Sequence, residues 1–108
     1  MHKTIEWAAG LFEGEGCITR VKDGRWQLQL EMSDQDVVEE WHRVMGLTTK
    51  ITHRPQRYGR KTKPTYMSQT RKLSEVQRCV AAMLPYFGNR RAYKALNCLD
   101  EIDTKLYS

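Results

Sequence analysis

Residues 25–32 alternate strictly between polar and apolar side chains, and this pattern constrains the fold more than any other feature of the sequence. The apolar members are Trp26, Leu28, Leu30 and Met32, and the polar members are Arg25, Gln27, Gln29 and Glu31. Because side chains alternate across a strand, the pattern predicts a strand with one face packed and one face in water. The preceding Asp23-Gly24 pair predicts a two-residue hairpin that joins this strand to another over residues 17–22.

The rest of the chain predicts helices and a second hairpin. The expected helices span residues 4–16, 33–45, 73–84 and 89–106, and the second pair of strands spans residues 48–54 and 65–71. Thr4, Ser33 and Asn89 are expected helix caps, and Pro85 stops the third helix. The last helix is expected to bury Leu96, Leu99, Ile102 and Leu106. This order predicts an α+β fold, with an antiparallel sheet that carries helices on one face and leaves the other open.

The length of 108 residues suits one domain over residues 1–108, which would bury roughly two-thirds of its unfolded surface. No apolar run approaches the ~20 residues that span a bilayer, and no signal sequence precedes the first helix. We therefore expect an intracellular protein without a membrane partner. The three cysteines, Cys17, Cys79 and Cys98, lack the spacing of a zinc site or a disulfide framework, so they are expected in the core.

The charge of the chain is positive and unevenly distributed. Eighteen Lys and Arg residues against thirteen Asp and Glu residues give a formal net charge of +5. No acidic residue lies between Glu40 and Glu75, although that stretch is rich in Lys and Arg. A solvated surface normally mixes both signs, so this stretch favours a polyanionic partner, above all nucleic acid. The alternative is a surface whose charge only keeps the protein soluble.

The segment from Ala8 to Gly16, Ala-Ala-Gly-Leu-Phe-Glu-Gly-Glu-Gly, suits a pair of helices beside a charged site. Gly10 and Gly14 lie four apart on one helical face, which lets a second helix approach closely. Glu15 precedes Gly16 at the helix end, so its carboxylate can project beyond the helix. In a symmetric pair two Glu15 carboxylates would meet, and a hard divalent cation such as Mg²⁺ would offset their repulsion. The alternative is a helix whose glycines serve local packing and whose glutamates are simply exposed.

This segment resembles the motif that names the LAGLIDADG homing endonucleases. Ala8, Phe12 and Gly14 are departures from the motif, and Glu replaces Asp at both acidic positions. The element order and the turn over residues 84–87 are also similar, so the resemblance covers most of the chain. It implies an αββαββα fold with a four-stranded antiparallel sheet and an open DNA-binding face.

The chain holds a single copy of the motif, and the resemblance therefore implies a homodimer. The expected dimer interface consists of Ala9, Gly10, Glu13 and Gly14. A two-fold symmetric protein implies a near-palindromic target in double-stranded DNA.

The resemblance also implies metal-dependent cleavage of both strands, with Glu15 as the metal ligand and Mg²⁺ as the cofactor. Members of the family often carry a glutamine at the end of the second strand, where this chain has Met32, so neighbouring Glu31 is the candidate for that role. Arg90 occupies the position of a family lysine near the scissile phosphate, with Arg91 as the alternative. An arginine there can stabilise phosphate charge but is a poor proton donor or acceptor.

The open face of the sheet is expected to read base edges in the major groove, while the hairpin tips hold phosphates. The expected base-reading residues are Arg25, Gln27, Gln29, Lys50, Thr52, Arg54, Met67 and Gln69. The expected phosphate-binding residues are Lys22, Arg57, Arg60, Lys61 and Lys63.

Three functions follow as hypotheses. The first is a site-specific double-strand DNA endonuclease linked to intron or intein mobility, and the retained Glu15 favours it. The second is a non-cleaving nucleic-acid-binding module of the same fold, such as an RNA maturase or a DNA-binding regulator, and Met32 favours it. The third is an unrelated basic domain for single strands or RNA. It would need aromatic residues on the open face, whereas Trp26 and Trp41 are expected to point inward.

Overall fold

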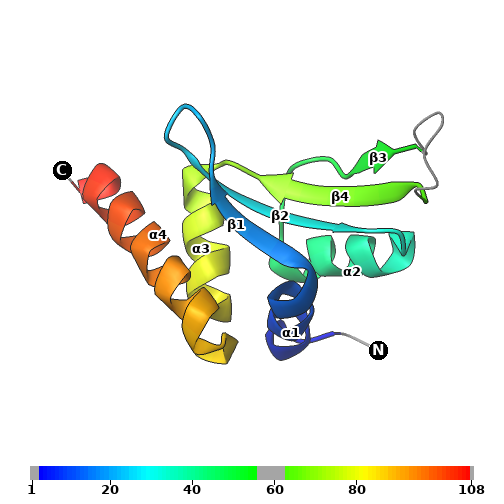
Figure 1. Ribbon diagram of the computed structural model, residues 1–108, viewed down its shortest axis with the longest axis horizontal. Helices are drawn as coiled ribbons and strands as arrows, with labels where there is room; N and C mark the ends of the chain where they lie inside the picture. Colours follow the sequence, from blue (N-terminus) through cyan, green and yellow to red (C-terminus); the bar gives the residue numbers. More distant parts are fainter. Residues whose placement is uncertain (1–2, 56–62, 108) are drawn as a thin grey trace.

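The computed structural model describes residues 3–55 and 63–107, and in it four α-helices pack against a four-stranded sheet (Figure 1). In chain order the elements are α1 (Ile5–Glu15), β1 (Gly16–Arg20), β2 (Trp26–Met32), α2 (Gln35–Met45), β3 (Thr52–Arg54), β4 (Thr65–Thr70), α3 (Leu73–Met83), the 3₁₀ turn η1 (Leu84–Tyr86) and α4 (Asn89–Tyr107). The α+β class and the predicted order of helices and strands are confirmed.

The sheet has the order β1-β2-β4-β3, and every neighbouring pair of strands is antiparallel. Figure 1 shows the helices on one side of the sheet and no helix on the other side. The predicted open face is therefore present. Within the described residues no helix combines the length and the apolar character needed to cross a bilayer.

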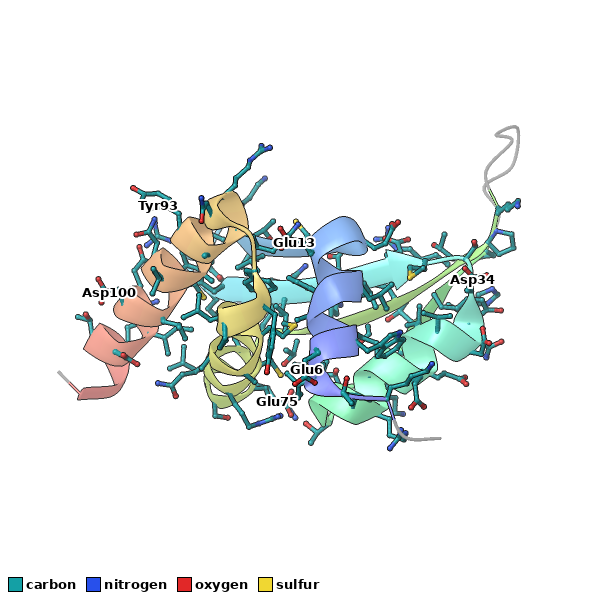
Figure 2. All side chains as sticks on the ribbon, turned by 90° about the horizontal axis from the view of Figure 1, so that it is seen from below. Glu6, Glu13, Asp34, Glu75, Tyr93 and Asp100 are labelled. Atoms are coloured by element: carbon teal, nitrogen blue, oxygen red, sulfur yellow. The ribbon has the colours of Figure 1, made fainter. Side chains whose placement is uncertain are left out.

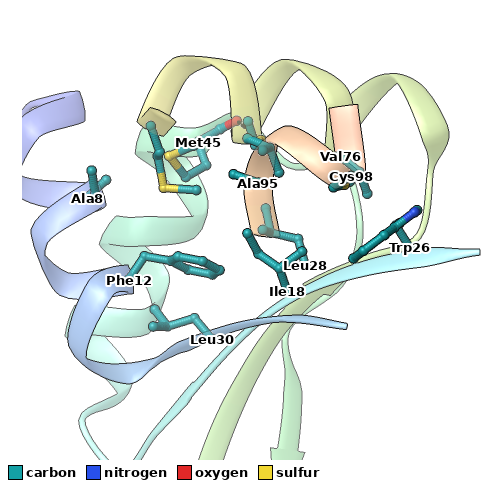
Figure 3. Close-up of a cluster of buried hydrophobic side chains, with 14 of the residues drawn as sticks. Ala8, Phe12, Ile18, Trp26, Leu28, Leu30, Met45, Val76, Ala95 and Cys98 are labelled. Atoms are coloured by element: carbon teal, nitrogen blue, oxygen red, sulfur yellow. Dashed lines mark hydrogen bonds between the residues drawn. The ribbon is translucent and has the colours of Figure 1, made fainter. Parts of the chain in front are cut away.

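The covered face of the sheet forms the floor of the hydrophobic core (Figure 3). Ile18, Leu28 and Leu30 are almost completely buried there. The Phe12 ring of α1 stacks on Trp41 of α2, with a centroid distance of 5.7 Å, and the Trp41 indole donates a hydrogen bond to the Ala8 carbonyl. Trp26 and Trp41 both point inward as predicted. Trp26 lies on the apolar side of the β2 alternation, which packs against the helices, and Trp41 lies on the buried face of α2.

The turn between β1 and β2 is longer than the predicted two-residue hairpin. The Gly24 amide donates to the Val21 carbonyl, and the Val21 amide donates to the Arg25 carbonyl. Gly24 has a φ of +87°, a left-handed conformation that glycine adopts without the steric cost of a Cβ. The chain thus reverses through a hydrogen-bonded turn that a left-handed glycine closes, a common three-residue hairpin connection.

Strand β3 covers only Thr52–Arg54, although residues 48–54 are predicted. The preceding residues make other contacts instead of sheet pairing. The Thr48 amide and hydroxyl both donate to the Glu75 carboxylate, and the Thr49 hydroxyl donates to the Gln69 carbonyl. These bonds hold the segment against α3 and β4 outside the ladder.

Two predicted helix caps are wrong. Asp34, and not Ser33, occupies the N-cap of α2, because the Val37 and Val38 amides donate to the Asp34 carbonyl. Helix α4 already includes Asn89, since the Ala92 amide donates to the carbonyl of the preceding Gly88.

On α4, the buried residues are Ala95, Cys98 and Ile102. They define an inner face that leaves Leu96 55% exposed, so the predicted burial of Leu96 is wrong. Leu99 is partly buried against the same core, and the side chain of Leu106 lies outside the described part of the chain.

The cysteines divide into two classes. Cys79 and Cys98 are buried as predicted, and burial raises the pKa of the Cys79 thiol to about 11 and that of Cys98 to about 12. Cys17 is exposed, so its predicted place in the core is wrong. It pairs with Gln29 in the β1–β2 ladder and therefore points to the open face of the sheet.

Candidate nucleic-acid interface

Helix α1 ends at Glu15, whose carboxylate is exposed and has no hydrogen bond or ion pair with another described residue. Strand β1 begins at the next residue, Gly16, whose amide donates to the Phe12 carbonyl. A Cβ at Gly16 would lie 2.0 Å from the Phe12 ring, so only glycine fits this position. The Phe12 ring thus fixes where the helix stops and where Glu15 lies.

The two faces of α1 have opposite characters. Ala8, Ala9 and Phe12 are fully buried in the core of the chain. Gly10 and Gly14 are exposed, and a Cβ added at either position would meet nothing within 4 Å. The predicted interface is therefore wrong at Ala9, because the methyl group of Ala9 packs inside the chain. It is consistent with the structure at the two glycines.

Glu13 lies on the flank of α1 that faces the start of α4 (Figure 2). One carboxylate oxygen accepts the Gly88 amide at 3.3 Å, and the other forms an ion pair with the Arg91 Nε at 3.2 Å. The Arg91 guanidinium also lies over the Phe12 ring. Glu13 was expected in a dimer interface, but these partners belong to its own chain.

A hollow of about 400 Å³ lies between the end of α1, the start of β1 and the start of α4. Cys17, Arg90, Arg91 and Lys94 are among the residues that line it. Arg90 has no hydrogen bond or ion pair with another described residue, so its charge is free to meet an anion. Lys94 was not predicted, although it lies one helical turn after Arg90 on the same face of α4.

Glu31 lies near the end of α1 that carries Glu15. Gly16 directly follows Glu15 and pairs with Leu30, and Glu31 is the residue after Leu30 on β2. The two carboxylate oxygens of Glu31 accept hydrogen bonds from Arg54 and Thr65. Met32 lies on the covered face, partly buried against the core, so it does not face the same side as Glu31.

The strand register defines the open face. Residues that pair directly in an antiparallel sheet point to the same side, and those that point away from the helices are Cys17, Thr19, Gln27, Gln29, Glu31, Thr52, Arg54, Thr65, Met67 and Gln69. All the predicted base-reading residues that lie within strands are in this set. The strand residues of this face include no aromatic side chain in the part of the chain that the structure describes.

Two residues of the open face are less accessible than the alternation predicts. Gln27 is 7% exposed, because its carbonyl oxygen accepts a bond from the Arg71 Nε at 2.7 Å and its amide donates to Gln29. Met67 lies on β4, which is flanked by β2 and β3 in the sheet, and it is 5% exposed. Both could meet a ligand only after their neighbours move.

Basic side chains surround this face. Lys22, Lys50 and Lys63 are exposed at its edges, and Arg25 is exposed in the hairpin turn with an ion pair to Asp23. Arg57, Arg60 and Lys61 lie outside the described residues. Arg71 was not predicted as a functional residue, although it continues the alternation of Met67 and Gln69 beyond the end of β4.

The described residues hold no cluster of metal-ligating side chains. Nowhere in the described residues do three or more His, Cys, Asp or Glu side chains come together in an arrangement that could hold an ion. Glu15 offers an exposed carboxylate that is unpaired among the described residues, and a carboxylate oxygen is a ligand that Mg²⁺ prefers.

No protein-family model and no curated protein sequence matches this chain. Solved structures of homing endonucleases do match it. I-CvuI in complex with the I-CreI target and Mg, with the DNA not cleaved, superposes with a TM-score of 0.68 at 18% identity over 92% of this chain. The chain has the homing-endonuclease fold.

Two further structures agree with this result. I-CvuI in complex with its own target and Ca gives a TM-score of 0.65 at 18% identity over 92% of this chain, and I-TnaI gives 0.66 at 16% identity over 94%. This chain spans 65% of the I-CvuI chains and 73% of the I-TnaI chain. The likeness is one of fold, extending over nearly all of the present sequence.

Proposed function

We propose that this chain is one half of a site-specific DNA endonuclease of the LAGLIDADG family, which acts as a homodimer on a near-palindromic target. The observation that carries the proposal is the position of Glu15. Its carboxylate, unpaired among the described residues, lies where the exposed face of α1 that carries Gly10 and Gly14 meets the open face of a basic sheet. The homing-endonuclease fold supports the same reading.

The pairing follows from the exposed side of α1. With no side chain at Gly10 or Gly14, the backbone of a second helix can approach closely along this stripe. Trp7 and Leu11 lie three residues before Gly10 and Gly14, respectively, and are only partly buried. Trp7, Gly10, Leu11 and Gly14 therefore form the proposed interface, with the same stripe on each protomer.

This pairing would bring the two Glu15 residues close to the symmetry axis. Mg²⁺ bound there would activate a water molecule and stabilise the oxygen that leaves the cleaved phosphodiester. Glu15 would hold the ion together with phosphate oxygens. Arg90, whose charge is unpaired within the described residues, would bind the phosphate from the side of α4 and stabilise its negative charge.

The open face would lie along the major groove of double-stranded DNA. Gln29 and Gln69 pair directly across β2 and β4, and a glutamine suits the donor and acceptor edge of adenine. Thr52 and Arg54 would extend the contact towards the edge of the sheet. Lys22 and Lys63 would contact phosphates, as would Arg57, Arg60 and Lys61.

The test is cleavage of a randomised duplex library in Mg²⁺ by the wild type, by Glu15→Gln and by the control Glu39→Gln, which alters an exposed carboxylate on α2. The wild type and the control should cut a defined sequence, whereas Glu15→Gln should bind but not cut. Specific cutting that survives Glu15→Gln would overturn the assignment of Glu15 as the metal ligand.

A non-cleaving nucleic-acid-binding module of the same fold is the second candidate. The hydrogen bonds that hold Glu31 to Arg54 and Thr65 and the inward position of Met32 favour it, since Glu31 is already engaged within the chain and Met32 lacks a strong hydrogen-bonding group for a catalytic water. Tight, sequence-selective binding by the wild type without cleavage in Mg²⁺ would support this candidate instead.

A further inference from the structure

A second hollow, of about 420 Å³, lies where β4 leads into α3, at the end of the open face opposite to Glu15. Its lining includes Arg25, Thr49, Lys50, Thr70, Arg71 and Lys72. We refer to it as the basic hollow. It is separate from the hollow beside Arg90, and no part of the proposed cleavage chemistry uses it.

The charge of the basic hollow is one-sided. Four of its lining residues are cations, and no carboxylate lines it. Arg25 forms an ion pair with Asp23, but none of the salt bridges among the described residues involves Lys50, Arg71 or Lys72. Asp23 lies near Arg71 and Glu75 lies near Lys72, so these carboxylates offset part of the positive charge. Four gathered cations still repel one another, and an anion between them would relieve that repulsion.

Arg71 is held in place by only one of its three side-chain nitrogens. Its Nε donates to Gln27 at 2.7 Å, while the two terminal nitrogens have no acceptor in the part of the chain that the structure describes. A guanidinium fixed in this way presents a fork of donors that matches two phosphate oxygens. Gln27 thus orients Arg71, and Arg71 in turn covers Gln27.

Lys72 is oriented by two threonines that are themselves held by a buried carboxylate. Glu75 is 7% exposed, and it accepts bonds from the Thr48 and Thr70 hydroxyls. The Thr48 hydroxyl in turn accepts a bond from the Lys72 ammonium group, and the Thr70 hydroxyl accepts one from the Lys72 amide. Arg71 and Lys72 are therefore positioned before any ligand arrives, which lowers the entropic cost of binding.

We propose that the basic hollow binds a single backbone phosphate of the DNA duplex, with Arg71 as the principal contact and Lys50 and Lys72 as supporting charges. This inference rests on the proposed function and adds an anchor point to it. Glu15 directly precedes Gly16, whose strand partner Leu30 is next to Glu31. Met67 pairs with Glu31 and lies four residues before Arg71. At about 3.3 Å per residue this is roughly 13 Å, so the anchored phosphate lies about four base pairs from the cleaved one.

The first test measures how the affinity for a mixed-sequence DNA duplex depends on salt, without Mg²⁺. The logarithm of the association constant falls with the logarithm of the salt concentration, and loss of one phosphate contact makes this negative slope shallower by about 0.9. Arg71→Gln should show this loss, and Arg71→Gln/Lys72→Gln should lose no more, because both residues serve one phosphate. The control Arg43→Gln removes one exposed charge from α2 and should leave the slope unchanged.

The second test uses the duplex recovered from the cleavage library, with one neutral methylphosphonate linkage at each position in turn. A substitution about four base pairs from the cleaved phosphate should weaken binding by the wild type but not by Arg71→Gln.

Three outcomes would overturn the proposal. They are an unchanged salt slope in Arg71→Gln, a slope that falls by about two contacts in the double variant, and a methylphosphonate profile that is identical in the wild type and Arg71→Gln. In each of these cases the wild type still binds duplex DNA, so the proposed function stands. A wild type that does not bind duplex DNA at all would overturn both.

Discussion

Arg91 holds Glu13 at two points: its Nε lies 3.2 Å from the Glu13 carboxylate, and a terminal nitrogen donates to the Glu13 backbone carbonyl at 3.2 Å. The first contact fixes a side chain and the second fixes the end of helix α1. Since Glu15 follows two residues after Glu13 and Arg90 directly precedes Arg91, the pair sets the relative positions of the two proposed active-site groups.

Glu13→Gln should therefore affect cleavage more than stability. The Glu13 side chain is 40% exposed, so loss of its ion pair should lower the free energy of unfolding by at most about 1 kcal/mol. Misplacement of Glu15 relative to Arg90 should lower the single-turnover cleavage rate by roughly tenfold or more. Thermal denaturation and single-turnover kinetics measure the two effects separately.

The matched control is Glu6→Gln, which alters the hydrogen bond from the Tyr86 hydroxyl at the other end of α1. It should leave the cleavage rate unchanged. Equal loss of cleavage in the two variants would show that Glu13 has no special positioning role.

Leucine at Gly10 or Gly14 should block dimer formation without damage to the chain itself. A side chain at either position enters open space, and replacing a helical glycine should stabilise the isolated helix by up to about 1 kcal/mol. Sedimentation should show a dimer for the wild type and monomers for Gly10→Leu and Gly14→Leu. The melting temperature of each leucine variant should be no lower than that of wild-type protein diluted until it is monomeric. Gly16→Ala, whose Cβ would collide with Phe12, should instead destabilise the fold. Dimers that persist in both leucine variants would exclude this face as the interface.

Glu75 should make the stability depend on pH in the acid range. Its burial alone would raise the pKa, but the bonds from Thr48 and Thr70 outweigh this, and the pKa of Glu75 is lowered from its ordinary value of 4.5. A lowered pKa in the folded state contributes stability that is fully present above the ordinary value and is lost as the pH falls through the folded pKa.

Glu75→Gln should therefore cost about 2 kcal/mol near neutral pH, since a buried charged acceptor is lost. The difference from the wild type should shrink below about pH 4.5. Urea denaturation at a series of pH values measures it, and a difference that stays constant down to strong acid would show that the carboxylate is not the stabilising form.

Cys17 should be the first cysteine to react with a thiol reagent. It is exposed, whereas Cys79 and Cys98 are buried and have raised pKa values that keep them as thiols. Mass spectrometry of the native protein after iodoacetamide should show one adduct, and denatured protein should show three. The adduct lies on the open face, so it should weaken duplex binding, whereas Cys17→Ser treated in the same way should bind normally. Early modification of Cys98 would contradict the described packing of α4.

Periodicity in the sequence is sufficient to predict which side of an element faces the core. The β2 alternation correctly separates Leu28 from Gln29, and the spacing of Gly10 and Gly14 correctly places both on the outer side of α1. Element order follows from the same periods together with turn residues.

Periodicity does not predict what a side chain meets once it leaves the backbone. Gln27 has the expected direction but is covered by Arg71, which lies more than forty residues later in the chain. Ala9 and Glu13 lie one helical turn apart on α1, yet Ala9 is buried and Glu13 is exposed. Only the packing of the neighbouring helices decides this difference. Leu96 is exposed for the same reason, because the smaller Ala95 and Cys98 face the other helices.

The direct succession of α1 and β1, with Glu15 ending one and Gly16 beginning the other, has a mechanical consequence. Because no loop residue separates them and the Phe12 ring lies against Gly16, we expect a tilt of the strand to carry the helix with it. In the proposed homodimer, a duplex that bends the sheet to fit its groove would tilt α1 in each protomer and shift the distance between the two Glu15 carboxylates. A poorly fitting sequence could then be held without being cut, since the geometry of the catalytic pair would depend on how well the DNA lies on a surface several base pairs away.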